Sequence, residues 1–250
     1  MPELRVNLWG HLSGAFGLGE GARCTARALE AAGVTVQWRN LPLNTHVNDQ
    51  PVPPPLAEPA AIDLIHTNPN VLRQTDGLME RLELAAPLRL GYWAWELEAF
   101  PIGWEVGFQG LDQLWCPSAF AAEALALRSP VPVSPLPHLI DWRRADRLAA
   151  RRLSLLPRAQ ARPFVVLFCF DFWSTVARKN PYGVVDAFQQ AFPPGHAARL
   201  VLKISSAEQF PDAMATLRER CCGDPRIELI DRHLSCLLYT SDAADDSLRV

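Results

Sequence analysis

The first residues with the means to do chemistry lie in a glycine-rich loop between a predicted strand and a predicted helix. The segment 10–19, GHLSGAFGLG, contains four glycines, including Gly14, Gly17 and Gly19. Glycine lets a backbone approach a ligand closely, and the following helix offers free N–H groups and a positive dipole end to an anion. We expect this loop to hold an acceptor or a phosphate, and a tight turn without a ligand is the alternative. Arg23, one turn into the helix, faces either such an anion or solvent.

A second group combines tryptophans with a carboxylate. Four tryptophans fall between positions 93 and 115, among them Trp93 and Trp95, and Glu96 follows directly. Aromatic faces stack on the apolar faces of sugar rings, but such a density also suits core packing. Because Glu96 lies just beyond the carboxyl end of a predicted strand, where α/β proteins gather ligands, we take it as the candidate catalytic carboxylate. A helix-capping role is the alternative.

The third group is cationic. Arg178 and Lys179 come directly before Asn180-Pro181, a predicted helix start, and Lys203 ends the predicted strand LVLK. Two cations beside a helix N-terminus suit a diphosphate group. We therefore expect Arg178, Lys179 and Lys203 to bind the diphosphate of a nucleotide ligand, with a surface basic pair as the alternative.

No familiar nucleophile or metal motif accompanies these groups. The sequence contains no GxSxG, Walker A or HExxH string, so it gives no reason to expect a metal or a tightly bound cofactor. The six histidines are scattered. His138, in the turn PLPHLID, is the one whose position is best defined.

These residues are positioned by two successive sets of alternating strands and helices. The first set consists of strands Leu4–Trp9, Val34–Trp38, Ile62–His66, Leu88–Trp93, Gln113–Cys116 and Val131–Pro135, with helices Glu20–Ala32, Val71–Leu84 and Ala119–Leu127. The second consists of strands Phe164–Phe170, Arg199–Ile204 and Ile227–Ile230, with helices Tyr182–Phe192 and Glu208–Cys221. Alternation of this kind predicts an α/β protein with two Rossmann-like domains on parallel sheets. We place them at 1–140 and 163–235, joined by a linker at 141–162, with the second domain incomplete.

Composition excludes several classes of protein. The 250 residues are 49% apolar and 20% charged, with a net charge of -3 and a pI of about 6.1, which argues against nucleic-acid binding. No apolar run approaches the ~20 residues of a membrane helix, and the N-terminus shows no signal-peptide pattern. The six cysteines form no CxxC pair, so neither a disulfide framework nor a zinc site is expected. These features favour a cytoplasmic protein.

The last fifteen residues do not continue the pattern. Back-translated, Cys236–Asp246 resembles a transposase adapter used in sequencing libraries. We therefore expect 236–250 to be a non-native tail, outside any argument about the fold. On that hypothesis the natural protein continues beyond Ser235.

Taken together, these motifs resemble retaining GT-B glycosyltransferases of the "glycosyl transferases group 1" type, which act in bacterial polysaccharide biosynthesis. The resemblance rests on the strings GAFGLGEGAR, YWAWELEAFP, LDQLWCPSAF, PLPHLID and FDFWSTVARKNPYGVVDAFQQAF followed by LVLKIS. It implies an acceptor-binding first domain and a second domain that binds a nucleotide sugar. It also implies that Lys179 contacts the donor diphosphate, with Arg178 or Lys203 assisting.

The resemblance implies a function as well. We expect a glycosyltransferase that moves a sugar from a nucleotide-sugar donor to a glycan or lipid-linked acceptor, with no nucleic-acid partner and possible peripheral membrane association of the full-length protein. The family's acidic E-x7-E segment would lie beyond Ser235, so we expect the chain as written to transfer no sugar. A non-catalytic glycan- or nucleotide-binding module is the alternative. A Rossmann oxidoreductase is disfavoured because strict GxGxxG spacing is absent.

Overall fold

A computed structural model describes most of the chain as two compact units, Met1–Trp142 and Arg143–Val250. The described residues are 3–44, 46–54, 56, 58–74, 82–140, 142, 146–147, 163–174 and 176–231. The predicted tail at 236–250 and most of the predicted linker at 141–162 lie outside them. Among the helices within these ranges, none combines the length and the apolar character that crossing a membrane requires.

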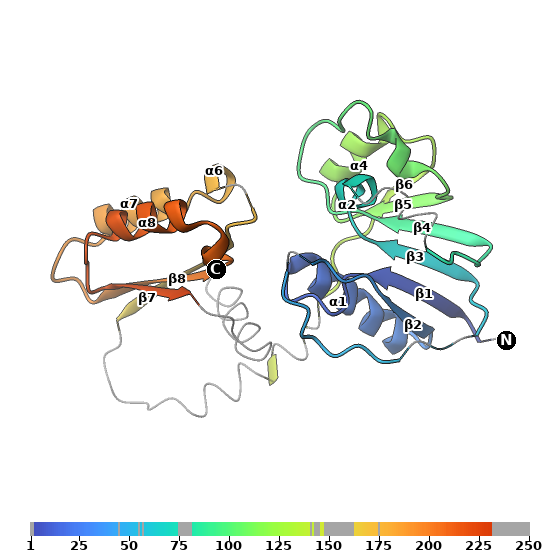
Figure 1. Cartoon of the computed structure of the whole chain (residues 1–250), viewed down its shortest axis with the longest axis horizontal. Coiled ribbons are helices and arrows are strands. Elements are labelled where there is room, and N and C mark those ends of the chain that lie inside the picture. The colour runs from blue at the N-terminus through green and yellow to red at the C-terminus, as the bar shows by residue number, and fades with distance from the viewer. Residues whose placement is uncertain are drawn as a thin grey trace. The chain divides into compact units, whose positions relative to one another are not determined.

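The first unit is built on a six-stranded parallel sheet with strand order β2-β1-β3-β4-β5-β6 (Figure 1). Its strands are β1 (Arg5–Gly10), β2 (Thr35–Asn40), β3 (Ile62–His66), β4 (Leu88–Tyr92), β5 (Gln113–Cys116) and β6 (Val133–Pro135). Its helices are α1 (Gly17–Ala31), α2 (Pro69–Gln74), the 3₁₀ helix η1 (Glu105–Phe108) and α4 (Ala119–Ala126). Strand β1 has β2 on one side and β3 on the other. The carboxyl ends of β1 and β3 therefore form the topological switch point, where open α/β sheets bind ligands.

Two hydrophobic clusters pack on this sheet. One joins Val6 and Leu8 of β1 to Ala22 and Ala26 of α1. The other gathers aromatic side chains after β4 around Trp93. Helix α1 approaches the sheet closely because Gly10 has no side chain: a Cβ there would lie 3.0 Å from the Cβ of Ala22.

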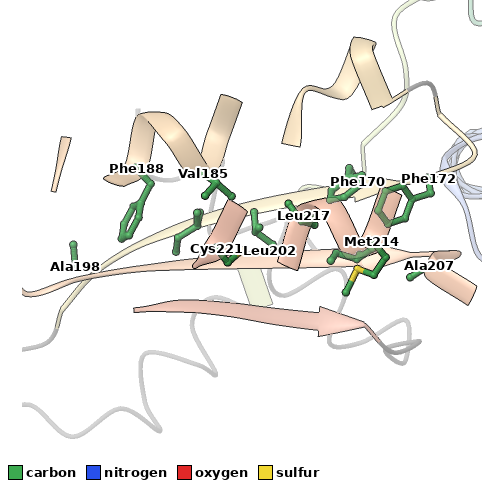
Figure 2. Packing of buried hydrophobic residues seen from close by; sticks show 12 residues of the cluster. Phe170, Phe172, Val185, Phe188, Ala198, Leu202, Ala207, Met214, Leu217 and Cys221 are labelled. Carbon is green, nitrogen blue, oxygen red and sulfur yellow. The ribbon is translucent and has the colours of Figure 1, made fainter. Parts of the chain in front are cut away.

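The second unit contains a three-stranded parallel sheet, β7-β8-β9. Its elements are β7 (Phe164–Asp171), α6 (Val176–Lys179), α7 (Pro181–Ala191), β8 (Ala198–Ser205), η2 (Ala207–Gln209), α8 (Pro211–Cys221) and β9 (Ile227–Asp231). Helices α7 and α8 lie on the same side of β7 and β8 (Figure 1). The core between them includes Phe170, Val185, Phe188 and Leu217 (Figure 2).

One prediction about β7 needs correction. Its continuous apolar run predicts a strand buried on both faces, yet Phe164 is 55% exposed and Val165 is 38% exposed. The reason is that, among the described residues, the core cluster forms against α7 and α8 on one face of the sheet. Phe170, which belongs to that cluster, is buried.

Helix boundaries follow local capping signals. Side chains cap two helix starts. Ser118 Oγ accepts from the N–H of Ala121 at 3.2 Å. At the predicted start of α7, Asn180 Oδ1 accepts from the N–H of Gly183 at 3.1 Å, and Pro181 lies in the first turn. Helix α1 begins at Gly17, three residues before the predicted start. Gly17 and Gly19 are therefore helical rather than part of a loop.

Candidate functional site

Histidines from distant parts of the sequence converge at the switch point of the first unit. His11 directly follows β1, His66 ends β3, and His138 follows β6. The strand order brings the first two together, because β1 pairs with β3 in parallel and Gly10 is level with His66. The segment 136–138 lies beside His66 as well. Tyr92, at the end of β4, stacks on His66 and donates its hydroxyl hydrogen to the carbonyl oxygen of Leu136 at 2.9 Å.

The hydrogen bonds of His11 define its neutral form. Its Nδ1 lies 2.6 Å from the carbonyl oxygen of Leu41, which can only accept, so Nδ1 carries the hydrogen. Its Nε2 lies 2.8 Å from the hydroxyl of Thr67, which then donates. Burial lowers the pKa of His11, although the bond to Leu41 opposes this effect. His11 therefore serves as a neutral connector between the loop and β3.

His66 has an unusual environment for a polar side chain. It is 1% exposed, and its ring stacks on Tyr92 with centroids 4.3 Å apart. Neither of its ring nitrogens has a hydrogen-bond partner among the described residues. Burial, with smaller contributions from the nearby imidazoles of His138 and His11, lowers its pKa to about 3. A buried polar group without a partner is costly, so its presence calls for an explanation.

His138 is the exposed member of the cluster. Its Nδ1 lies 3.2 Å from the Tyr92 hydroxyl. Because that hydroxyl already donates to Leu136, Nδ1 must be the donor and Nε2 keeps a free lone pair. Partial burial lowers the pKa of His138, while burial raises the pKa of Tyr92 to about 12. Both side chains are thus neutral near pH 7.

The glycines of the predicted loop differ in how much space a side chain would find at each position. A Cβ on Gly19 would lie 2.4 Å from the carbonyl oxygen of Gly14 and 2.6 Å from that of His11, so Gly19 is needed for close packing of the loop on the helix. At Gly14 a Cβ would collide with the ring of Phe16. At Gly17 a Cβ would meet nothing within 4 Å. Of the three predicted glycines, Gly17 is the one that leaves open space.

Arg23 does not face solvent, so that alternative is wrong, whereas a contact with a bound anion stays a prediction. It is 5% exposed, and its guanidinium donates to the carbonyl oxygens of Leu12 and Gly14, each at 2.8 Å. It also pairs with Glu20 at 2.8 Å. Sequence spacing could not reveal this role, because the loop folds back over the helix that carries the arginine. These contacts fix the loop on the helix that carries Arg23.

The tryptophans after β4 occupy the second hydrophobic cluster. Trp93 is fully buried and lies against Phe108, with ring centroids 4.7 Å apart. Trp95 is half-buried and packs on Phe100, with ring centroids 5.1 Å apart. These contacts agree with the core-packing alternative. Glu96 is exposed in the loop that follows β4.

In the second unit, the cationic pair precedes a capped helix as expected. Arg178 and Lys179 form the last turn of the short helix α6, directly before Asn180 and α7. Arg178 is exposed and Lys179 is half-buried. Asn180 has a left-handed backbone with φ of 51°, which turns the chain sharply between α6 and α7 and places both cations at the N-terminal end of α7.

Lys203 has a different environment from this pair. It is 4% exposed, and its ammonium group donates to the carbonyl oxygen of Ile204 and to the Ser205 hydroxyl. Burial lowers its pKa, whereas Cys169, Asp231 and Asp171 act in the opposite direction. Lys203 is therefore held within the carboxyl edge of the sheet.

Sequence reasoning missed His11, His66, Tyr92 and Gly21 as members of a cluster. The available signal was positional: His11 and His66 each stand at the carboxyl end of a predicted strand, the edge where ligands gather. Within the described parts of the chain, no three His, Cys, Asp or Glu side chains are grouped so that they could hold a metal ion.

The fold defines a class. Two sets of parallel strands joined by helices make this chain an α/β protein with Rossmann-like units. Seven chains of known structure match it. One of them, the "OtsA apo structure", aligns with 97% of this chain and 76% of its own length, with a TM-score of 0.56 and 11% sequence identity. A likeness at this identity shows the fold alone.

Sequence comparisons add no family to this result. No protein-family model matches the chain, and no curated protein matches it. The predicted fold class is thus confirmed by structure, while the specific family stays a prediction.

Proposed function

We propose that this chain belongs to a glycosyltransferase that moves a sugar from a nucleotide-sugar donor to a glycan or lipid-linked acceptor. The observation that carries the proposal is the GT-B-like fold together with a cationic pair before α7. OtsA, whose fold this chain shares, is itself a GT-B glycosyltransferase.

The second unit supplies the groups that a nucleoside diphosphate needs. Arg178 and Lys179 stand between β7 and α7, on the connection that leaves the carboxyl edge of the sheet. A guanidinium and an ammonium group there stabilise the negative charge that develops on a departing diphosphate. The N-terminal end of α7 adds a favourable dipole. Lys203 stabilises the same carboxyl edge of the sheet through its hydrogen bonds to Ile204 and Ser205, and it does not contact the diphosphate in this proposal.

In this proposal the first unit binds the acceptor. Its switch point offers neutral histidines and the open space at Gly17. Trp93 and Trp95 stabilise the loop after β4 by packing, and Glu96 is the exposed carboxylate of that loop. No metal is required, since the cations of the second unit carry the electrostatic part of catalysis.

A nucleotide titration tests the donor half of this proposal. We expect UDP, GDP or ADP to bind the whole chain, and Arg178→Ala and Lys179→Ala each to weaken that binding about tenfold, in line with the loss of one charge-assisted hydrogen bond. Isothermal titration calorimetry measures both effects, and higher salt should weaken binding in the unsubstituted chain.

The matched control is Arg199→Ala. Arg199 is an exposed arginine in the same unit, and it pairs with Glu228 near the opposite end of β8. Its loss should leave nucleotide affinity unchanged. Failure of all three nucleotides to bind, or equal affinity in the Arg178 and Arg199 variants, would contradict the donor site.

A further inference from the structure

A proline-rich segment lies on the surface of the first unit between β2 and β3. Residues 49–59 have the sequence DQPVPPPLAEP, and residues 51–54 belong to no helix or strand. Proline fixes its own φ at about −65° and holds the residue before it in extended or polyproline II backbone. Gln50, Val52, Pro53 and Pro54 each precede a proline. The sequence therefore favours a left-handed polyproline II helix over residues 50–54.

Hydrogen bonds to the rest of the unit hold this segment on both sides. Before the prolines, the N–H of Gln50 donates to the carbonyl oxygen of Ser13 at 3.0 Å. After them, the guanidinium of Arg39 donates to the carbonyl oxygen of Leu56 at 2.8 Å. Because the segment is ordered before any partner arrives, binding costs it little further conformational entropy.

The three residues per turn of polyproline II decide which side chains face outwards. Val52 packs against the core cluster of β1 and α1, so its edge of the helix faces the protein. Pro51 and Pro54, three positions apart, share another edge, and both are exposed, as is Pro53. We call these three residues the proline ridge. Its P-x-x-P spacing is the one that aromatic-lined grooves of polyproline-binding domains take up.

The proline ridge is flanked by acidic side chains. Asp49 precedes it and Glu58 follows it, both are exposed, and residues 41–61 include no lysine or arginine. Glu58 pairs with Arg5 at 3.0 Å, whereas Asp49 accepts from the neutral amide of Gln50 at 2.7 Å. Opposite charges at the rim of an interface orient and speed binding. A groove with a cation at its rim therefore matches the ridge better than one with an acidic rim.

We propose that the proline ridge is a docking site for a protein domain with an aromatic-lined groove and a lysine or arginine at the rim of that groove. Pro51 and Pro54 fill neighbouring pockets between the aromatic rings, and Asp49 faces the cation. The ridge contains none of the groups proposed for sugar transfer, so partner binding is a separate property of the first unit.

Titration of the whole chain with purified SH3, WW and EVH1 domains tests the site. These three kinds of domain share aromatic-lined grooves for proline-rich segments. In the nitrogen-15-labelled chain we expect at least one of them to shift the N–H signals of Gln50, Val52 and Leu56, and high salt to weaken that binding. The absence of these shifts with all three domains would overturn the proposal.

The decisive variant is Pro51→Ala combined with Pro54→Ala. It removes the two rings that fill the pockets, so we expect binding to weaken at least about tenfold. The matched control, Pro42→Ala combined with Pro59→Ala, removes two exposed prolines of the same connection outside the ridge and should bind like the unsubstituted chain. Both pairs should lower the melting temperature slightly, because each gives the unfolded chain more freedom. Equal affinities in the two double variants would show that the prolines only stiffen the connection.

Asp49→Lys tests the charge at the rim. We expect weaker binding together with a smaller salt dependence, since the attraction to the cation is replaced by repulsion. Equal or tighter binding in this variant would contradict a cationic rim. Nucleotide binding at Arg178 and Lys179 should be the same in every ridge variant, so the two proposals can fail independently.

Discussion

Replacing Asp63 with alanine is expected to lower the free energy of unfolding of the first unit by about 4 kcal/mol. Asp63 is fully buried in β3. One carboxyl oxygen accepts from the side-chain amide of Asn7 at 2.8 Å and from the indole of Trp9 at 3.0 Å, and the other accepts from the N–H of Ala86 at 2.9 Å. Alanine leaves three donors without an acceptor inside the protein.

Asp63→Asn is the matched comparison. Its amide oxygen can still accept from Asn7 and Trp9, but its NH₂ group then faces the N–H of Ala86, so we expect a loss between zero and that of alanine. Urea unfolding followed by tryptophan fluorescence measures the order. Equal stability of Asp63→Ala and the unsubstituted chain would show that this network does not hold β1, β3 and the segment before β4 together.

Lowering the pH from 7 to 5 is expected to destabilise the first unit by about 2 kcal/mol through His66 alone. Its pKa is about 3 in the folded chain against an ordinary value of 6.5. Between these two pH values His66 is protonated in the unfolded chain but stays neutral in the folded chain. The contribution of neutral His66 to the free energy of unfolding is therefore fully present above pH 6.5 and is lost as the pH falls towards 3.

His66→Phe should remove this part of the pH dependence and raise stability at pH 7. His11 and His138 also have lowered pKa values and act in the same direction, so a smaller slope should persist in the variant. The lowered pKa of Glu20 acts only at more acidic pH, below its ordinary 4.5. Urea midpoints at pH 5, 6 and 7 give the slope. Identical slopes in both chains would mean that His66 is protonated in the folded state.

Local sequence signals were enough to predict most elements and the fold class. Apolar runs indicated the strands, and short-range capping by Ser118 and Asn180 fixed the starts of α4 and α7. These signals act over three or four residues, so they are readable without tertiary structure. The same holds for the cationic pair before α7, whose position follows from its place next to a helix start.

The tertiary structure alone decided what the polar residues contact. Strand order brings His11, His66 and His138 together across more than a hundred positions of sequence, and no local pattern encodes that pairing. Arg23 and Lys203 carry charges typical of a ligand site, but burial and nearby carbonyl oxygens commit both of them to the fold. Sequence determines where strands and helices form because those preferences are local, whereas burial and convergence depend on which faces pack together.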